Sequence, residues 1–340
     1  MSWITHNLHM VGERLPLAVH RILVKRDFIV INYHMVSDLR LAHVAHLFPY
    51  KTTEMFEHDL DFLIRNFHVI SYDQITGFLY GDNGLPDRAV ALTFDDGFTE
   101  CFEVVRPLLL KRGIPCSFFI STNTIDNKDM AKEQKASLCI EKILASDEES
   151  IALVNQSMPR TVEQALTGRQ ELIAFIKSTG LHDNALIEHL GSLLGINFDE
   201  YLLEHAPYLT TDQIRLMDSE GFTIGSHGKE HIQFSSLPEN KIESAITESC
   251  NEIGNLTGKT SVPFAFPHNA DGVSRDLLKR ILDSYKHIGL FFDSNGIHKE
   301  ETFLISRLNG DRPNQGDEKK SHLSLNIKKA YIEELANRYR

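Results

Sequence analysis

Short apolar runs alternate with amphipathic segments along most of this chain. The run Phe28–Tyr33 is apolar and rich in β-branched residues, which is typical of a buried strand. The segment 52–67 instead has the apolar spacing of a helix. The same patterns predict further strands at 69–70, 89–94, 115–120, 222–226, 262–266 and 288–292, and helices at 72–80, 102–111, 238–256 and 273–284. About seven strands, most followed by a helix, favour a parallel sheet with helical cover, either closed as a barrel or open.

Two parts of the chain break this alternation. Residues from about 122 to 210 have little β-branched character, and helices are expected there at 131–145, 162–178 and 184–194. We interpret this interval as a helical insertion between two strands, not as an independent domain. The tail 313–340 begins as a polar stretch, becomes helical and is expected to lie outside the core. The domain that contains the sheet is expected to span 28–312, after an N-terminal amphipathic segment at 1–27.

The charge of the chain narrows the class of partner. Thirty-five basic and forty-seven acidic residues among 340 give a net charge of −12. This excess disfavours a nucleic-acid partner and opposes binding to an anionic membrane or a strongly acidic glycan, whereas a neutral sugar meets no such repulsion. The four cysteines form no C-x-x-C pair, so we expect free buried thiols in a reducing compartment.

The N-terminal segment lacks the features of a secretory signal. His6, His9, Glu13 and Arg14 interrupt any continuous apolar stretch of the required length. No run approaches the roughly 20 apolar residues of a membrane span. We therefore expect a cytoplasmic protein. The mildly amphipathic stretch 4–24 could pack on its own domain, or make a peripheral contact with a membrane or a partner.

The first candidate for chemistry is a pair of adjacent carboxylates. Asp95 and Asp96 follow the strand 89–94 and precede Gly97, which permits a sharp turn that exposes both side chains. Neighbouring residues at a strand end point in different directions, so one carboxylate can bind a metal while the other faces the substrate. Adjacent like charges are costly unless a cation or a donor compensates them. The alternative for so short a motif is a solvated turn.

A histidine pair completes the candidate site. His227 and His231 follow the strand 222–226, and their four-residue spacing lets both imidazoles reach one ion. Two histidines and one carboxylate form a common open site for zinc or iron. Asp96 would be the third ligand, and Asp95 would accept a proton from the attacking water. With seventeen histidines in the chain, such a pair can arise by chance, so the hypothesis depends on the combination.

The two motifs together resemble a known family. Thr93–Gly97 resembles the first motif of the NodB-type polysaccharide deacetylases, the fourth carbohydrate esterase family, and Ile224–His231 resembles the second. The resemblance implies that Asp95 is the general base, and that Asp96 and the two histidines bind one divalent ion, Zn²⁺ in preference to Co²⁺ or Ni²⁺. It also implies a distorted (β/α)7-type barrel with a helical insertion. Gly228 departs from the family, which usually has Ser or Thr after the first histidine.

The third motif is altered. Phe264–His268 resembles the family's usual Arg-x-Pro-Tyr motif, in which the backbone N–H after the proline helps to hold the oxyanion. The resemblance assigns this part to Pro267 and His268, because a histidine supplies the same N–H as a tyrosine. The arginine that usually contacts the base is absent at Ala265, and Arg307 is our candidate to replace it.

The candidate general acid lies early in the chain. Asn32–His34 resembles a circularly permuted branch of the family, in which a Tyr-His near the N-terminus takes the place of a late Leu-x-His motif. The histidine of that branch protonates the leaving amine, so the resemblance assigns this role to His34. The alternatives are a structural histidine at this position, or His298 as the acid. The resemblance as a whole runs from about residue 28 to 310.

The resemblance implies hydrolysis of an N-acetyl group from an acetylated amino sugar, free or in a polysaccharide or glycan precursor. Cleavage of a carbohydrate O-acetyl ester is the nearest alternative, because the chemistry differs mainly in the leaving group. A hydrolase of a small-molecule amide, such as an acylated amino sugar on a nucleotide, is another. A catalytically inactive sugar-binding module of the same fold belongs to a different class, and the altered third motif permits it.

Overall fold

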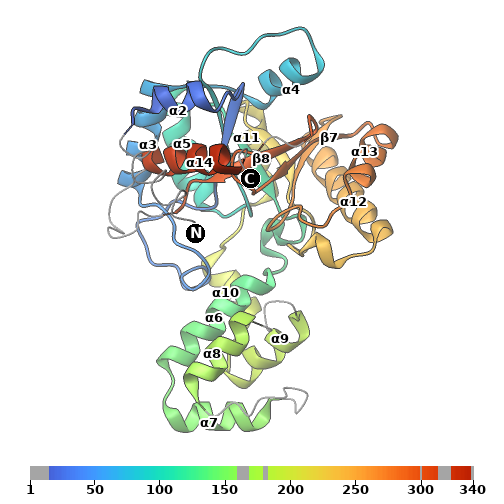
Figure 1. Ribbon diagram of the computed structural model, residues 1–340. Helices are drawn as coiled ribbons and strands as arrows, with labels where there is room; N and C mark the ends of the chain where they lie inside the picture. The colour runs from blue at the N-terminus through green and yellow to red at the C-terminus, as the bar shows by residue number, and fades with distance from the viewer. Residues whose placement is uncertain (1–14, 159–167, 179–182, 299–300, 313–322, 338–340) are drawn as a thin grey trace. The chain divides into compact units, whose positions relative to one another are not determined.

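A computed structural model describes residues 15–158, 168–178, 183–298, 301–312 and 323–337 (Figure 1). The predicted helix at 162–178 and the tail 313–340 each lie partly outside these residues. The chain divides into two compact units. The barrel unit contains the described residues of Met1–Asp38, Tyr50–Asp126 and Tyr208–Arg340, and the helical unit contains those of Leu39–Pro49 and Asn127–Pro207.

Parallel strands form the centre of the barrel unit. The described strands are β1 Phe28–Tyr33, β2 His68–Val69, β3 Ala89–Phe94, β4 Ser117–Ile120, β5 Thr223–Ser226, β6 Val262–Ala265, β7 Ile288–Asp293 and β8 Leu304–Asn309. Seven of these described strands close a barrel in the order β1-β8-β7-β6-β5-β4-β3, because β1 also pairs with β3 from Phe28–Ala89 to Tyr33–Phe94. β2 pairs only with the beginning of β3. The prediction of a (β/α)7-type barrel is therefore confirmed.

The hydrophobic pattern did not predict β8. In a strand of the expected kind, the inward positions would be apolar, but β8 places Arg307 in the barrel wall with no exposed surface. The guanidinium group of this arginine meets a carboxylate inside the barrel, as described below. The strand was therefore missed because one of its buried residues is charged.

Helices surround the strands. The barrel unit contains α2 Leu17–Leu23, α3 Thr53–Asn66, α4 Tyr72–Tyr80, α5 Arg106–Arg112, α11 Thr211–Ser219, α12 Glu239–Thr257, α13 Arg275–Ser284 and α14 Leu323–Asn337. A π-helical turn, Cys101–Val105, leads into α5, and 3₁₀ turns occur at Thr122–Asn127 and Phe234–Ser236. α12 packs on β5 and β6, and α13 packs on β7 (Figure 1).

The core has two apolar layers because side chains alternate along each strand. The outer layer lies between strands and helices, and it includes Ile31 of β1 and Leu92 of β3. The inner layer fills the barrel and includes Val30, Ala91 and Phe119. α4 adds Tyr72 to this inner layer, where its hydroxyl accepts a hydrogen bond of 3.1 Å from the backbone N–H of Leu290. Apolar side chains thus line the barrel toward its amino end, and polar side chains gather at its carboxyl end.

The tail does not lie outside the core, which corrects the expectation for its described part. α14 runs beside α2 and contacts α3 (Figure 1). Leu323, Ile327 and Tyr331 are buried in the outer apolar layer. They recur at four-residue spacing, so one face of the helix is apolar and is buried against the unit that carries the barrel.

The helical unit contains α6 Lys132–Ala145, α7 Glu148–Ser157, α8 Arg169–Ser178, α9 Asn184–Leu193 and α10 Phe198–His205. The distant segment Leu39–Pro49 belongs to it. The Ser137 hydroxyl on α6 donates to the backbone oxygen of Ala42 at 2.7 Å, and Arg40 donates to both carboxylate oxygens of Glu141 at 2.8 and 2.7 Å. These contacts hold the segment on α6, although the sequence pattern does not connect the two.

Two sequence-based expectations concern the whole chain. All four cysteines are buried free thiols, as predicted. Among the described residues, no helix combines the length and the apolar character that a membrane crossing needs.

Candidate metal-binding and catalytic site

The adjacent aspartates lie where β3 ends. The backbone N–H of Asp95 donates to the backbone oxygen of Tyr33 at 2.9 Å, which extends the pairing with β1 by one residue. Asp96 and Gly97 then adopt left-handed backbone angles, with φ of +72° and +78°. A Cβ atom on Gly97 would lie 2.8 Å from Cγ2 of Ile120, so close packing also favours glycine there. The turn lets both carboxylates reach the carboxyl end of the barrel.

His227 is oriented by a backbone carbonyl. Its Nδ1 lies 2.9 Å from the backbone oxygen of Ala265. A carbonyl only accepts, so Nδ1 carries the proton and the lone pair of Nε2 is directed elsewhere. Nε2 lies 3.5 Å from Oδ1 of Asp96. Burial lowers the pKa of His227 to about 4, so the imidazole is neutral at neutral pH and can act as a ligand.

His231 reaches the same carboxylate oxygen from the following loop. Its Nε2 lies 3.3 Å from Oδ1 of Asp96, and its φ is +51°. Gly228 precedes it with a φ of +76°, and the backbone N–H of Gly228 donates to the Ser226 hydroxyl at 3.1 Å. Glycine suits that backbone angle, which gives a local reason for the departure from the family motif at this position.

Asp96, His227 and His231 form a group that fits a divalent ion. One ligand atom from each side chain lies within 4.8 Å of the others. Oδ1 of Asp96 is buried and accepts no hydrogen bond from the described residues. Burial alone would raise the pKa of Asp96, but the nearby imidazole of His231 holds it well below its usual range. An ionised carboxylate with two imidazole nitrogens is a typical donor set for an open zinc site.

Asp95 has a different environment from its neighbour. Arg307 donates to both of its oxygens, at 2.7 Å to Oδ1 and 2.8 Å to Oδ2, and Asn32 donates to Oδ2 at 3.0 Å. Burial would raise the pKa of Asp95, but the charge of Arg307 lowers it, so the carboxylate is ionised. Its Oδ2 lies 3.9 Å from Nε2 of His227. This places an ionised carboxylate directly beside the candidate metal ligands.

Arg307 is itself held in place. Its guanidinium group donates to the side-chain oxygens of Asn32 and Thr93, both at 3.2 Å. Phe119 lies beneath it, with 5.2 Å between the guanidinium carbon and the ring centroid. Asn32 and Thr93 begin the motifs Asn32–His34 and Thr93–Gly97, but the sequence assigned neither of them a role in the site. Their position on the inner face of paired strands β1 and β3 is the signal that could have identified them.

His34 pairs with Asp311, a residue that lies outside all of the sequence motifs. Its Nδ1 donates to Oδ2 of Asp311 at 2.6 Å, and its backbone N–H donates to Oδ1 at 3.4 Å. Burial would lower the pKa of His34, but the hydrogen bond to Asp311 outweighs it and raises the pKa to about 9. Tyr33 pairs with Phe94, so His34 leaves β1 at the same level at which Asp95 leaves β3.

The loop after β6 brings His268 to the site. Its ring centroid lies 4.9 Å from that of His231, and its φ is +61°. The buried carboxylate of Asp293, at the end of β7, accepts from the backbone N–H groups of Ala270 and Ser294 at 2.8 and 2.7 Å. Asp293, which the motifs also missed, thus fixes the loop that carries Pro267 and His268.

The rival histidine lies elsewhere. His298 Nδ1 pairs with Glu334 of α14, and its side chain lines a cavity beside the first residues of β1 and β8. The structure therefore places His34, and not His298, near the two aspartates.

Comparisons with known proteins agree with this fold and these motifs. The family model for polysaccharide deacetylase matches residues 82–143 and 189–290. Asp95, Asp96, His227 and His231 lie within the matched residues, whereas His34 and Arg307 lie outside them. A search of curated proteins finds no match.

Solved structures share the barrel at low sequence identity. The deacetylase PplD of Streptococcus pyogenes, in complex with acetate, is 12% identical, with a TM-score of 0.53 over 83% of this chain and 91% of that one. IcaB from Ammonifex degensii is 16% identical, with a TM-score of 0.50 over 83% and 91% of the two chains. A polysaccharide deacetylase from Bacillus cereus is 12% identical, with a TM-score of 0.50 over 90% and 68%. With the fold shared and both aspartates and both histidines inside the family match, this chain belongs to the polysaccharide deacetylase family of carbohydrate-active hydrolases.

Proposed function

We propose that this protein removes an N-acetyl group from an acetylated amino sugar in a polysaccharide or glycan precursor, with one divalent metal ion. The observation that carries the proposal is the contrast between the two aspartates. Asp96 faces two imidazole nitrogens, whereas Asp95, beside it, is ionised and held by Arg307. This is the arrangement that metal-assisted hydrolysis needs: a ligand set next to a base.

Asp96, His227 and His231 would hold the ion, and Zn²⁺ suits these donors best, with Co²⁺ or Ni²⁺ as alternatives. The bound ion would supply Lewis-acid chemistry to the acetyl carbonyl and to the attacking water. Asp95 accepts the proton of that water as its oxygen forms a bond to the carbonyl carbon. Arg307 keeps Asp95 ionised and fixes both of its oxygens, which is the part we assign to it in place of the missing motif arginine.

The remaining residues act on the two ends of the breaking amide. The backbone N–H of His268, after Pro267, donates to the oxygen that becomes negative. His34 donates its proton to the nitrogen as the C–N bond breaks, and the products are acetate and a free amine. The buried carboxylate of Asp311 keeps His34 protonated for this step. An amine leaves only when protonated, so the His34–Asp311 pair favours an amide over an ester substrate.

The position of His34 supports placing the chain in the circularly permuted branch of the family. The acid precedes the Asp-Asp-Gly motif in the sequence, yet β1 carries it to the side of β3. A barrel closes in space whatever the order of its strands, so a residue from the first strand can serve the same site as one from the last.

Two isosteric substitutions on neighbouring residues test the proposal. Asp96→Asn should lose the bound metal, because the carboxylate ligand is gone. Asp95→Asn should keep the metal and lose acetate release from an N-acetylated sugar oligomer by about 10²- to 10⁴-fold. The measurements are elemental analysis of the purified protein and acetate release from N-acetylated and O-acetylated oligomers.

Three results would contradict the proposal. They are the absence of a divalent ion after purification without chelators, activity retained by Asp95→Asn, and release of acetate from esters only.

A further inference from the structure

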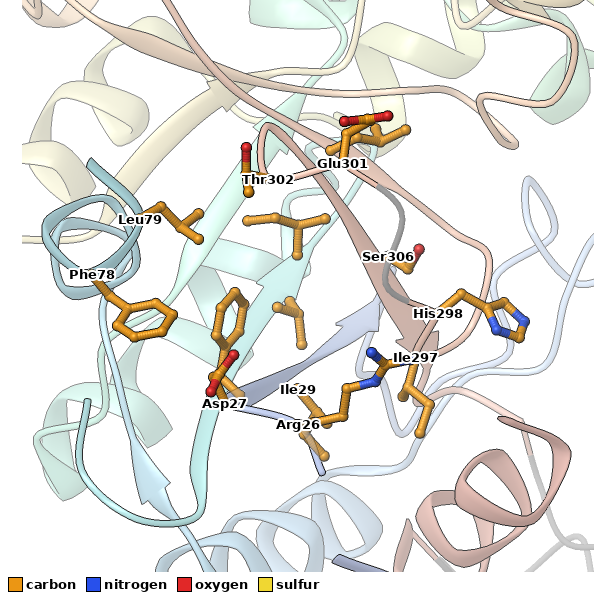
Figure 2. Close-up of a pocket in the computed structure, with 14 residues that line it drawn as sticks. Arg26, Asp27, Ile29, Phe78, Leu79, Ile297, His298, Glu301, Thr302 and Ser306 are labelled. Carbon is orange, nitrogen blue, oxygen red and sulfur yellow. The ribbon is translucent and has the colours of Figure 1, made fainter. Parts of the chain in front are cut away.

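A cavity lies at the other end of the barrel from the candidate catalytic site, between β1 and β8. Pairing of these strands is present from Val30–Arg307 onward. The earlier residues of both strands, Phe28–Val30 and Leu304–Ser306, line a space of about 290 Å³ (Figure 2). We call this space the β1–β8 cavity. Asp95 and His227 follow the carboxyl ends of their strands, so the two sites are separate.

The body of the β1–β8 cavity is apolar. Phe28 and Phe78 meet edge to face, with ring centroids 6.4 Å apart. Leu79 of α4 completes this side, as Figure 2 shows. The remaining apolar lining includes Ile297, Leu304 and Ile305. Such walls favour an apolar ligand over a hydrated polar one.

The wall of the cavity also contains a buried hydroxyl group. Ser306 lines the cavity and is only 7% exposed. Its hydroxyl makes no hydrogen bond with the described residues. A buried hydroxyl without a partner costs free energy, which a ligand with a donor or an acceptor at this point would recover.

The charged residues at the rim do not select an ion. Arg26 and His298 both pair with the same carboxylate, Glu334 of α14. Asp27 and Glu301, which also line the cavity, are exposed acidic residues. The positive charge of Arg26 is therefore already paired with Glu334, and an anionic ligand would gain little from it.

From these observations we infer that the β1–β8 cavity binds a neutral, mainly apolar molecule with one hydroxyl or carbonyl group placed against Ser306. A cavity of about 150 Å³ accommodates benzene, so a ligand of about a dozen non-hydrogen atoms matches this volume. The ligand is distinct from the acetylated sugar, whose site is lined by charged and polar groups. The inference does not depend on the proposed function, because it concerns binding alone.

A pair of probes that differ by one hydroxyl tests the inference. The probes are 3-phenylpropan-1-ol and propylbenzene, with dissociation constants measured on the full chain by NMR titration. Wild-type protein should bind both. Ser306→Ala should weaken 3-phenylpropan-1-ol by about fivefold to tenfold through loss of one hydrogen bond, and leave propylbenzene nearly unchanged.

A variant with a larger side chain in the β1–β8 cavity tests whether the probes bind there. Leu79→Trp should weaken both probes by more than tenfold, because the larger ring occupies the cavity. Leu216→Trp, the same substitution at an exposed site on α11, should change neither. Asp96→Asn should also leave both constants unchanged, which separates this inference from the metal site.

The inference fails if wild-type protein binds neither probe up to its solubility limit, or if folded Leu79→Trp binds both normally. An equal effect of Ser306→Ala on both probes would overturn the role of the hydroxyl. If Leu79→Trp does not fold, crystals of the wild-type protein soaked in a para-iodinated 3-phenylpropan-1-ol decide the question. The anomalous peak must then lie between Phe28 and Ser306, and a peak elsewhere overturns the location.

Discussion

Two neighbouring residues of the same type have opposite surroundings in this protein. Asp95 accepts three hydrogen bonds from Arg307 and Asn32, all between 2.7 and 3.0 Å. Oδ1 of Asp96 accepts none from the described residues and faces the Nε2 atoms of His227 and His231. An oxygen that already accepts several hydrogen bonds is a poor metal ligand, whereas a buried carboxylate oxygen beside two imidazole nitrogens is well placed to share a cation with them. The environment, and not the residue type, separates the two roles we propose.

Arg307 should control the pH at which activity begins. Its charge lowers the pKa of Asp95, which burial alone would raise. A base works only when ionised, so activity is lost as the pH falls through that pKa. Arg307→Met should therefore shift the acidic limb of the kcat/KM profile to higher pH. Arg307→Lys keeps the positive charge, so the acidic limb should lie at lower pH than in Arg307→Met. It should still reduce kcat/KM by about tenfold or more, because a lysine cannot hold both carboxylate oxygens of Asp95.

The control is another paired arginine. Arg106→Met removes a partly exposed partner of Glu220, away from Asp95. It should leave the acidic limb in place. An unchanged limb in Arg307→Met, in protein that still melts cooperatively, would contradict the assignment.

Asp311 should control the other limb. Its hydrogen bond raises the pKa of His34 to about 9, against the effect of burial. A bound cation would repel the protonated imidazole and lower this pKa, but removal of Asp311 would lower it further. An acid is lost as the pH rises through its pKa, so Asp311→Asn should move the alkaline limb of kcat/KM to lower pH. The measurement is the pH profile on an N-acetylated oligomer.

An ester substrate distinguishes the loss of the general acid from a general loss of activity. Activated acetyl esters need less protonation of the leaving group, so Asp311→Asn and His34→Gln should slow them less than amides. Equal losses on both substrates would argue against His34 as the acid.

At the scale of elements, close contacts between strands position the ligands. Gly225 lies in β5, two residues before His227. A Cβ atom there would lie 2.5 Å from Cδ1 of Phe119 and 2.8 Å from the backbone oxygen of Pro263. Strands β4, β5 and β6 therefore approach one another at a point where no larger residue fits. Three non-glycine residues of the loops that follow β3, β5 and β6, namely Asp96, His231 and His268, also have positive φ, a cost often found at functional sites.

Gly225→Ala should disturb the site through β5. Because the backbone of β6 cannot yield cheaply, we expect a loss of about 1–3 kcal/mol in the free energy of unfolding. The accompanying shift of His227 should weaken metal binding by about tenfold or more. Denaturant unfolding and a metal titration measure the two effects.

Gly84→Ala is the matched control, since a Cβ atom there meets nothing within 4 Å. It should be neutral or slightly stabilising. Equal behaviour of the two variants would show that β5 tolerates displacement.

At the scale of the whole molecule, the helical unit consists of two segments that interrupt the chain of the barrel unit. At both interruptions, the barrel residues before and after the segment are joined by a backbone hydrogen bond. The backbone N–H of Ser37 donates to the oxygen of Lys51 at 2.9 Å, and that of Asp126 donates to the oxygen of Leu209 at 3.0 Å. The residues that flank each of the two segments of the helical unit therefore lie side by side within the barrel unit.

Removal of the helical unit should leave a folded barrel. In a variant with short Gly-Ser linkers in place of both 39–49 and 127–207, little loop-closure entropy is lost, because the joined ends are already neighbours. We expect cooperative thermal unfolding, and metal affinity within about tenfold of the full chain. Circular dichroism and a metal titration check these expectations.

A second variant, which lacks only 127–207, keeps the segment 39–49 without its partner helices and should expose Val44, which is buried in the full chain. It should aggregate more readily than the variant that lacks both segments. Non-cooperative melting of the double deletion would show that the barrel depends on the helices.

Local patterns in the sequence predicted the parts of this protein that depend on near neighbours. Apolar runs predicted the strands from β1 to β7, because a strand buried on both faces needs apolar residues throughout. Thr93–Gly97 and Ile224–His231 predicted the aspartates and histidines, since each motif is a single turn after a strand. The resemblance based on them predicted the barrel.

Tertiary structure alone decided the contacts between distant segments. It paired Asp95 with Arg307, which the sequence offered only as a candidate, across 212 positions, and it paired His34 with Asp311 across 277. It also made β8 a strand despite its buried arginine, closed the barrel through β1 and β3, and joined Leu39–Pro49 to α6. The spacing of apolar residues in a segment predicts which of its faces is buried, but not which other segment covers that face. Which charged residues of distant segments pair with each other is determined only when the barrel closes, because burial without water then requires each charge to have a partner.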